Sequence, residues 1–283
     1  MKKQIRNLII FSVVSVGGGF LGLALDRLDP PADPMQGLGV LLWLASPLLA
    51  NLLLRALGGD GWKDFGLRPH FKESWRWYLV SVVIAPVVIL LSLGLGVLAG
   101  AASLTGFQEQ GIQVLLPLAA AAFGGAMIKN IFEEFAWRGY LTPRLEALGV
   151  HPFLNSLLTG LVWAGWHIPY YLYFLDRAEL ETHTSLGIPV FIALAFIILP
   201  LQSLAYGELR LLSKSVWTVW LLHNVANALS MPLTGAGLVT LQDGFRDALF
   251  TPGTQGIFHT LLMLGADLIL YRLRRNKSTA DSM

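Results

Sequence analysis

The sequence contains no cysteine among its 283 residues, and charged side chains make up only 13% of it. The absence of cysteine excludes disulfide bonds and thiolate chemistry, so any nucleophile or metal ligand must use oxygen or nitrogen. Soluble domains usually contain about 25% charged residues, whereas 54% of this chain is hydrophobic. This composition is typical of a polytopic membrane protein. The net charge of +2 is too small to indicate a nucleic-acid partner.

Several common protease patterns are missing as well. The chain has neither a Gly-x-Ser-x-Gly nucleophile elbow nor a His-Glu-x-x-His stretch. Asp267 is the only aspartate inside an apolar run. Aspartyl chemistry, which needs two aspartates that share a proton, is therefore disfavoured.

Apolar runs predict about eight membrane-spanning helices, because most of them approach or exceed the roughly 20 residues that cross a bilayer. The first run could be a signal peptide, but no convincing cleavage site follows it, so we interpret it as a retained helix. The expected fold is all-α, and the expected spans are residues 8–25, 36–57, 78–100, 112–148, 152–174, 187–209, 215–231 and 256–272.

Basic residues outside these spans are distributed very unevenly. Fifteen lie on the side of the N-terminus, against Arg27, Arg177 and Arg246 on the other side. By the positive-inside rule both termini are expected in the cytoplasm, which requires an even number of spans. Tryptophans among the basic residues of the connection after residue 57 indicate a segment at the membrane interface. We expect an integral protein of the plasma membrane.

The most informative stretch is residues 131–141, Ile-Phe-Glu-Glu-Phe-Ala-Trp-Arg-Gly-Tyr-Leu. A charge inside a bilayer costs about 2.5 kcal/mol or more unless it is paired or hydrated, so such clusters usually have a function. Glu134 and Arg138 share a helix face at i and i+4, and Glu133 is in register with Lys129. The alternative is a buried ion-pair network that only fixes helix packing.

Two histidines and an asparagine complete the polar set. Glu133 and His167 each lie about 15 residues from the turn between their helices, roughly 22 Å deep at the helical rise, so they are level. His223 and Asn227 share a face of their helix, but His223 would lie only roughly 14 Å deep. Tilt or a longer helix must close that gap. Pro169, two residues after His167, is expected to free a carbonyl and to kink the helix that carries His167.

Three motifs follow one another on separate expected helices, and together they resemble a known family. They are Glu-Glu-x-x-x-Arg-Gly at 133–139, Trp163-x-x-x-His167 and His223-x-x-x-Asn227. This combination looks like the CAAX-protease and bacteriocin-processing intramembrane endopeptidases, also called the Abi or Rce1-like family. The Gly-Leu-Arg at 66–68 is similar to many bacterial members. The sequence departs from the pattern at Trp163, where phenylalanine is common, and at Lys129, which adds a charge beside the glutamate pair.

The resemblance implies a single transmembrane domain, residues 1–283, with a catalytic core at about 112–231. It implies that Glu133 activates water, that Glu134 and Arg138 support it, and that Asn227 donates to the oxyanion. His167 and His223 would position the water or, with Glu133, hold a divalent metal, for which zinc is the expected ion. A site without metal remains open.

The expected partners are membrane lipid and a peptide or membrane-protein substrate, in a bacterial plasma membrane. The rival interpretation is a non-catalytic transporter or bacteriocin-immunity protein that uses the same polar cavity.

Overall fold

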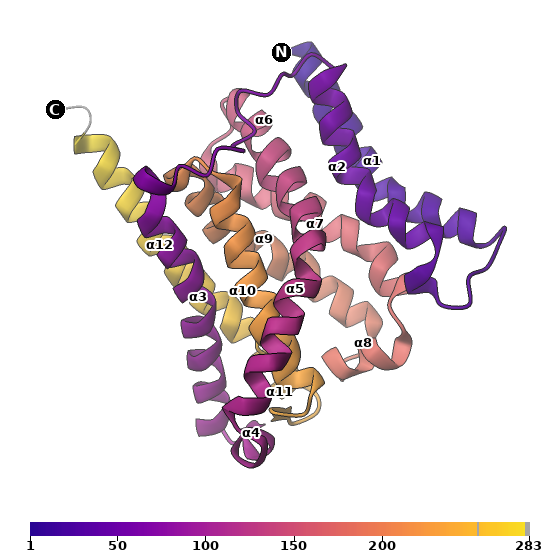
Figure 1. Cartoon of the computed structure of the whole chain (residues 1–283), viewed down its shortest axis with the longest axis vertical. Coiled ribbons are helices and arrows are strands. Elements are labelled where there is room, and N and C mark those ends of the chain that lie inside the picture. Colours follow the sequence, from indigo (N-terminus) through magenta and orange to yellow (C-terminus); the bar gives the residue numbers. More distant parts are fainter. Residues whose placement is uncertain (254, 281–283) are drawn as a thin grey trace.

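The computed structural model describes residues 1–253 and 255–280. Its long helices form one bundle (Figure 1). Each of them coincides with one of the eight expected spans, which confirms the all-α class. These helices are α1 (Lys2–Asp26), α2 (Leu38–Ala56), α3 (Phe71–Leu98), α5 (Ile112–Ala136), α7 (Pro152–Pro169), α9 (Ile188–Ser213), α10 (Val216–Gly235) and α12 (Ile257–Ala280).

Shorter elements connect the long helices. The π-helical turn η2 (Trp137–Leu141) and helix α6 (Thr142–Ala147) continue α5, and a second π-helical turn, η3 (Tyr170–Phe174), continues α7 directly after Pro169. Strands β1 (Ala102–Ser103) and β2 (Thr240–Leu241) pair antiparallel. The remaining elements are η1 (Pro34–Gln36), α4 (Thr105–Gln110), α8 (Arg177–His183) and α11 (Phe245–Phe250).

Five helical segments of the described chain are long and apolar enough to cross a membrane. They are α1, α2, α3, the continuous segment Ile112–Ala147 and α9. Large apolar side chains such as Ile9, Val13 and Leu90 lie exposed on these helices, as expected where lipid is the solvent. An integral membrane protein is therefore supported. Helices α7, α10 and α12 are not among the five, so a count of eight spans remains a prediction.

The bundle is assembled from helix pairs that are often distant in sequence. Helix α1 packs on α2, α7 on α9, and α5 on α10. Between α2 and α7, Trp43 and Trp166 stack with ring centroids 4.1 Å apart. Each indole N–H donates to the other residue's carbonyl, at 2.7 and 2.9 Å. These bonds satisfy both buried donors and fix α7 against the N-terminal hairpin.

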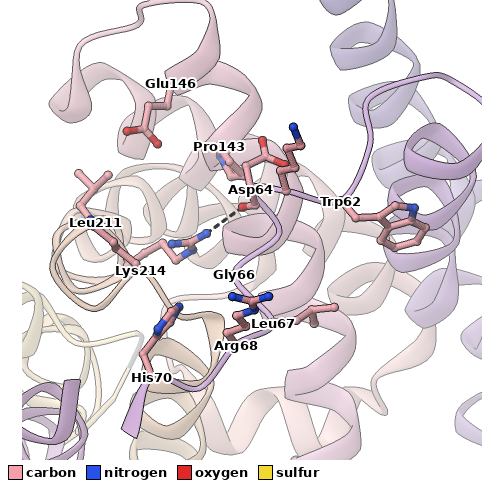
Figure 2. Close-up of a pocket in the computed structure, with 12 residues that line it drawn as sticks. Trp62, Asp64, Gly66, Leu67, Arg68, His70, Pro143, Glu146, Leu211 and Lys214 are labelled. Atoms are coloured by element: carbon pink, nitrogen blue, oxygen red, sulfur yellow. Dashed lines mark hydrogen bonds between the residues drawn. The ribbon is translucent and has the colours of Figure 1, made fainter. Parts of the chain in front are cut away.

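The two ends of the bundle differ. The start of α1, helix α6 and the C-terminal part of α12 lie at one end, while α4, α8 and α11 lie at the other (Figure 1). The segment between α2 and α3 crosses the first end. Its Gly66 carbonyl accepts from Val216 N at 3.0 Å, and its Leu67 carbonyl accepts from Trp217 Nε1 at 2.8 Å. Figure 2 shows Gly66, Leu67 and Arg68 of this segment around a cavity that Lys214 also lines.

Candidate active site

The predicted pair between Glu134 and Arg138 is confirmed. Arg138 Nη1 lies 3.2 Å from Glu134 Oε1, and both side chains are completely buried. The same carboxylate oxygen lies 2.8 Å from Nδ1 of His223, on α10. Because a carboxylate accepts hydrogen bonds, His223 donates through Nδ1, which leaves its Nε2 with a lone pair. Glu134 thus orients one imidazole while it neutralises one guanidinium.

Arg138 is held by aromatic rings as well as by the carboxylate. Its guanidinium carbon lies 4.8 Å from the ring centre of Trp163 and 4.7 Å from that of Tyr206. Nη2 also donates to Ser203 Oγ at 3.1 Å. Cation–π contacts of desolvated arginine contribute about 2 kcal/mol. The positive charge of Arg138 is therefore stabilised by Glu134 and also by the two aromatic rings and the serine hydroxyl.

Glu133 has two donors, one on each carboxylate oxygen. Lys129 forms an ion pair with Oε1, as the i,i+4 register predicts, and Trp163 Nε1 donates to Oε2 at 2.7 Å. A phenylalanine at position 163 could not make the second bond. Glu133 is only 1% exposed, whereas the Lys129 side chain is 37% exposed. Of the two members of this ion pair, only Lys129 is accessible to water.

His167 and His223 line one cavity of about 130 Å³ together with Lys129, Trp163 and Asn227. Nδ1 of His167 lies 2.9 Å from the carbonyl oxygen of Trp163, so Nδ1 donates and Nε2 carries the lone pair. The imidazole of His167 also stacks on Tyr171, with ring centroids 5.3 Å apart. The cavity thus brings together two oriented imidazoles, an ammonium group and a carboxamide.

The shallow depth predicted for His223 is wrong. Its Nδ1 lies within hydrogen-bonding distance of Glu134, so the two residues are at one level. The prediction measured depth along α10 alone. The turn before α10 has Lys214 exposed, while Ser213, Ser215 and Val216 are buried, and the segment between α2 and α3 accepts hydrogen bonds from Val216 and Trp217.

Asparagine side chains connect α5 to α10 beside the glutamates. Asn130 Nδ2 donates to Asn224 Oδ1 at 2.8 Å, and Asn227 Nδ2 donates to Asn130 Oδ1 at 3.3 Å. Asn227 keeps a second N–H that no protein group of the described chain accepts. Sequence reasoning selected Asn227 but missed Asn224, Ser203 and Tyr206. Asn224 could have been noticed, since it is polar within an apolar run, but nothing local indicates its partner.

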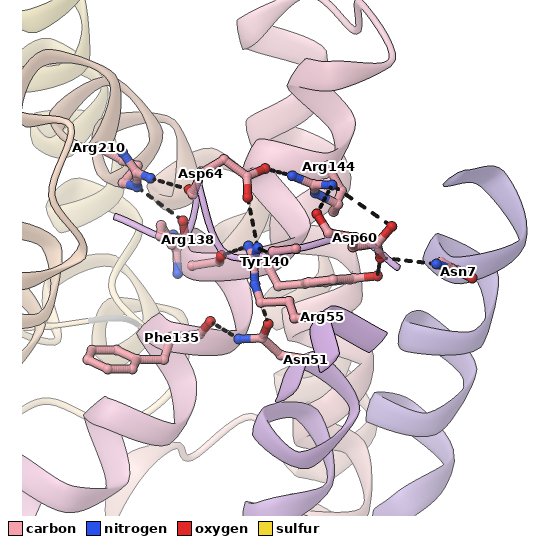
Figure 3. Close-up of polar contacts among 12 residues, drawn as sticks. Asn7, Asn51, Arg55, Asp60, Asp64, Phe135, Arg138, Tyr140, Arg144 and Arg210 are labelled. Atoms are coloured by element: carbon pink, nitrogen blue, oxygen red, sulfur yellow. Dashed lines mark hydrogen bonds and ion pairs between the residues drawn. The ribbon is translucent and has the colours of Figure 1, made fainter. Parts of the chain in front are cut away.

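The π-helical turn η2 follows the glutamate pair and leaves backbone carbonyls without backbone donors. Thr142 N donates to Trp137 O, and the next residue, Pro143, has no N–H. Side chains fill these positions: Arg55 Nη2 donates to Gly139 O at 2.5 Å, and Arg210 Nε donates to Arg138 O at 3.1 Å. Figure 3 shows them converging on the turn from two sides, with Arg55 coming from α2.

Gly139, the last residue of the first motif, is required by packing. A Cβ atom at this position would lie 2.5 Å from the ring of Phe65. Phe65 is buried and belongs to the segment between α2 and α3. The glycine therefore allows that segment to dock directly on the turn that follows the glutamates.

The arrangement does not fit the predicted zinc ligand set of Glu133, His167 and His223. Among the residues that the structure describes, no three His, Asp or Glu side chains are placed to hold a metal ion. Both oxygens of Glu133 face donors, and one of these is an ammonium group. The mechanism below therefore uses no metal, and zinc remains a prediction.

Comparison with protein families identifies the region that contains both glutamates, both histidines and Asn227. Residues 114–229 match the model of the type II CAAX prenyl endopeptidase Rce1-like family. No protein of curated function matches the chain. The resemblance inferred from the three motifs is thereby confirmed. Together with the apolar helices, the match supports a membrane-embedded protease, which is a hydrolase.

Proposed function

Since residues 114–229 match the model of the Rce1-like family, we propose that the protein is an intramembrane endopeptidase in which Glu133 activates water. The observation that carries this proposal is the cavity that His167, His223 and Asn227 share with both partners of Glu133. The substrate is a peptide bond of a membrane-embedded or lipid-proximal protein. This assignment rests on the chemistry of the cavity and on the family.

Peptide hydrolysis needs a base, a proton carrier and a donor for the oxyanion. The cavity offers the proton carrier and the donor, and Glu133, the base, is bonded to Lys129 and Trp163 of its lining. Lys129 is paired with Oε1 of Glu133, and because its side chain is 37% exposed it can turn towards water, which frees Oε1. Glu133 then takes a proton from water as its oxygen attacks the peptide carbon. The free N–H of Asn227 donates to the carbonyl oxygen as it becomes negative.

Collapse of the tetrahedral intermediate requires a proton on the leaving nitrogen. In this mechanism Nε2 of His167 or His223 carries this proton from Glu133 to the amine as the C–N bond breaks. The Glu134 carboxylate orients His223 through the 2.8 Å contact with Nδ1, in the way that a buried carboxylate orients a catalytic histidine. Glu134 and Arg138 are thus positioning residues in this mechanism.

The test of the proposal is cleavage by the purified protein. Full-length protein in detergent is screened against a library of fluorogenic peptides, with and without lipid modification. We expect cleavage at a defined bond, identified by mass spectrometry. If no peptide is cleaved and the protein instead moves or sequesters a solute in liposomes, the rival function as a transporter or immunity protein holds.

We also propose eight spans with both termini in the cytoplasm. Basic residues gather at the end of the bundle where α1 begins, and this end also contains α6 and the C-terminal part of α12 (Figure 1). Reporter fusions at residue 30 and at the C-terminus should therefore report opposite sides of the membrane. The same side for both fusions would contradict this topology.

Chelation decides between the metal-free mechanism and the predicted zinc site. Because both Glu133 oxygens already have donors, we expect cleavage to survive treatment with a strong chelator, with elemental analysis confirming that metal is absent. Loss of activity that zinc, cobalt or manganese restores would instead establish the zinc centre predicted from the sequence. The activity of the untreated enzyme is the reference for both results.

A further inference from the structure

A second cavity lies at the end of the bundle where α1 begins, outside the candidate active site. It has a volume of about 790 Å³, which is within the usual range of ligand pockets. The segment between α2 and α3 forms one wall, and α6 and the end of α9 form others (Figure 2). Its charged and titratable lining residues are Lys63, Asp64, Arg68, His70, Glu146, Arg210 and Lys214.

The positive charge of this cavity is largely unneutralised. Asp64 is already paired with two guanidinium groups, those of Arg55 and Arg144, behind the cavity wall (Figure 3). By contrast, the side chains of Lys63, Arg68 and Lys214 form no ion pair or hydrogen bond within the part of the chain that the structure describes. Glu146 is the one other acidic residue of the lining. The cavity therefore attracts an anion.

The backbone of the lining is unusual. His70 and Lys214 have φ angles of 51° and 57°, and they are the only non-glycine residues with positive φ among the described residues. Left-handed backbone is unfavourable for such side chains and occurs preferentially at binding sites. Both residues present a nitrogen-bearing side chain to the same cavity (Figure 2).

The surroundings place this cavity at the membrane interface. Trp62 and Leu67 of its lining are exposed, and so are Phe71 and Trp75 at the start of α3. Tryptophan beside basic residues is typical of the headgroup region of a bilayer. Lipid headgroups and solutes of the aqueous phase can both reach a cavity at that level, and phosphate is the common anionic group of the two.

We propose that this basic cavity binds a phosphate group, presented by an anionic phospholipid headgroup or by a soluble phosphate. Arg68 and Lys214 are the direct ligands, because both are unpaired and line the cavity. Arg210 lies behind them, where Nη2 donates to Asp64 O at 2.9 Å and Nε donates to Arg138 O. The bound anion would thus be connected through one side chain to the turn that follows the glutamates.

The experiment measures stabilisation of the full-length protein in neutral detergent by three probes. These are dihexanoyl phosphatidylglycerol, dihexanoyl phosphatidylcholine and inorganic phosphate, each titrated while the thermal unfolding midpoint is followed. The test variant combines Arg68→Gln with Lys214→Gln. The matched control combines Lys72→Gln with Arg76→Gln, which removes the same charge from exposed residues that do not line the cavity.

We expect phosphatidylglycerol or inorganic phosphate to stabilise the wild type and the control, with apparent affinity at least about tenfold weaker in the test variant. A response to phosphatidylglycerol alone identifies a lipid headgroup as the source, and an equal response to inorganic phosphate identifies a soluble phosphate. Either result supports the proposal.

Three results would overturn the proposal: no stabilisation by either anionic probe, equal loss in test and control variants, or a response to phosphatidylcholine as strong as that to phosphatidylglycerol. If the test variant unfolds without ligand, Arg68→Gln alone is measured in the same way, and its unchanged affinity would also count against the site.

Discussion

Replacing Glu133 by glutamine should lower peptide cleavage by at least about 10²-fold, the usual effect of losing a general base. The amide preserves the shape of the side chain and one acceptor for Lys129, but it cannot take a proton from water. One hydrogen bond to a charged group, that from Trp163 Nε1 or that from Lys129, is also weakened. This should cost about 1.5 to 3 kcal/mol of stability, so the variant still folds.

The measurement compares initial cleavage rates and thermal unfolding of Glu133→Gln and wild type in the same detergent. Glu109→Gln is the control, because Glu109 is exposed and far along the chain from the motifs. This control should cleave at the wild-type rate. Robust cleavage by Glu133→Gln would remove Glu133 from the mechanism, whatever the state of the other residues.

Replacing Glu134 by glutamine should damage folding as well as activity. The change leaves the guanidinium of Arg138 buried without an opposite charge, and breaking a buried pair in this way costs about 3 to 5 kcal/mol. The contacts of Arg138 with Trp163 and Tyr206 place the expected loss nearer the lower value. Cleavage should fall too, because His223 loses the carboxylate that orients it.

Unfolding free energy in mixed micelles measures this effect, and Glu181→Gln is the matched control. Glu181 pairs with Arg177 at the same i,i+4 spacing, but both side chains are well exposed, at 62% and 77%. Removing an exposed pair costs about 0.5 kcal/mol or less. If Glu134→Gln and Glu181→Gln lowered the unfolding free energy by the same amount, the buried pair would contribute no more to stability than the exposed pair.

Sequence predicted the parts of the site that depend on a single helix. The pairs Glu134–Arg138 and Glu133–Lys129 follow from i,i+4 spacing, and the structure contains both. The eight helices follow from apolar runs in the same way. A distortion of the helix near Pro169 follows from the missing N–H of proline, and the π-helical turn η3 begins directly after it. In each case the cause lies within a few residues of the effect, so an isolated chain segment already contains the information.

The remaining features depend on contacts between distant segments. The position of His223 beside Glu134 depends on how α10 packs against α5. The bond from Trp163 to Glu133 depends on how α7 packs against α5. No local pattern distinguishes the π-helical turn η2 from a continuing α-helix, since its carbonyls are satisfied by Arg55 and Arg210 from elsewhere in the chain.

The two arginines that donate to the turn η2 become available at different times during synthesis at the ribosome. Proteins are made from the N-terminus, at about 5 to 20 residues per second. When α5 and α6 have been made, Arg55 is already present to bind the carbonyl of Gly139, but Arg210 lies 72 residues beyond Arg138. His223 is made later still. The nascent chain therefore holds its glutamate pair in an unfinished environment until α9 and α10 are inserted, and the groups proposed to hydrolyse peptides meet only near the end of translation.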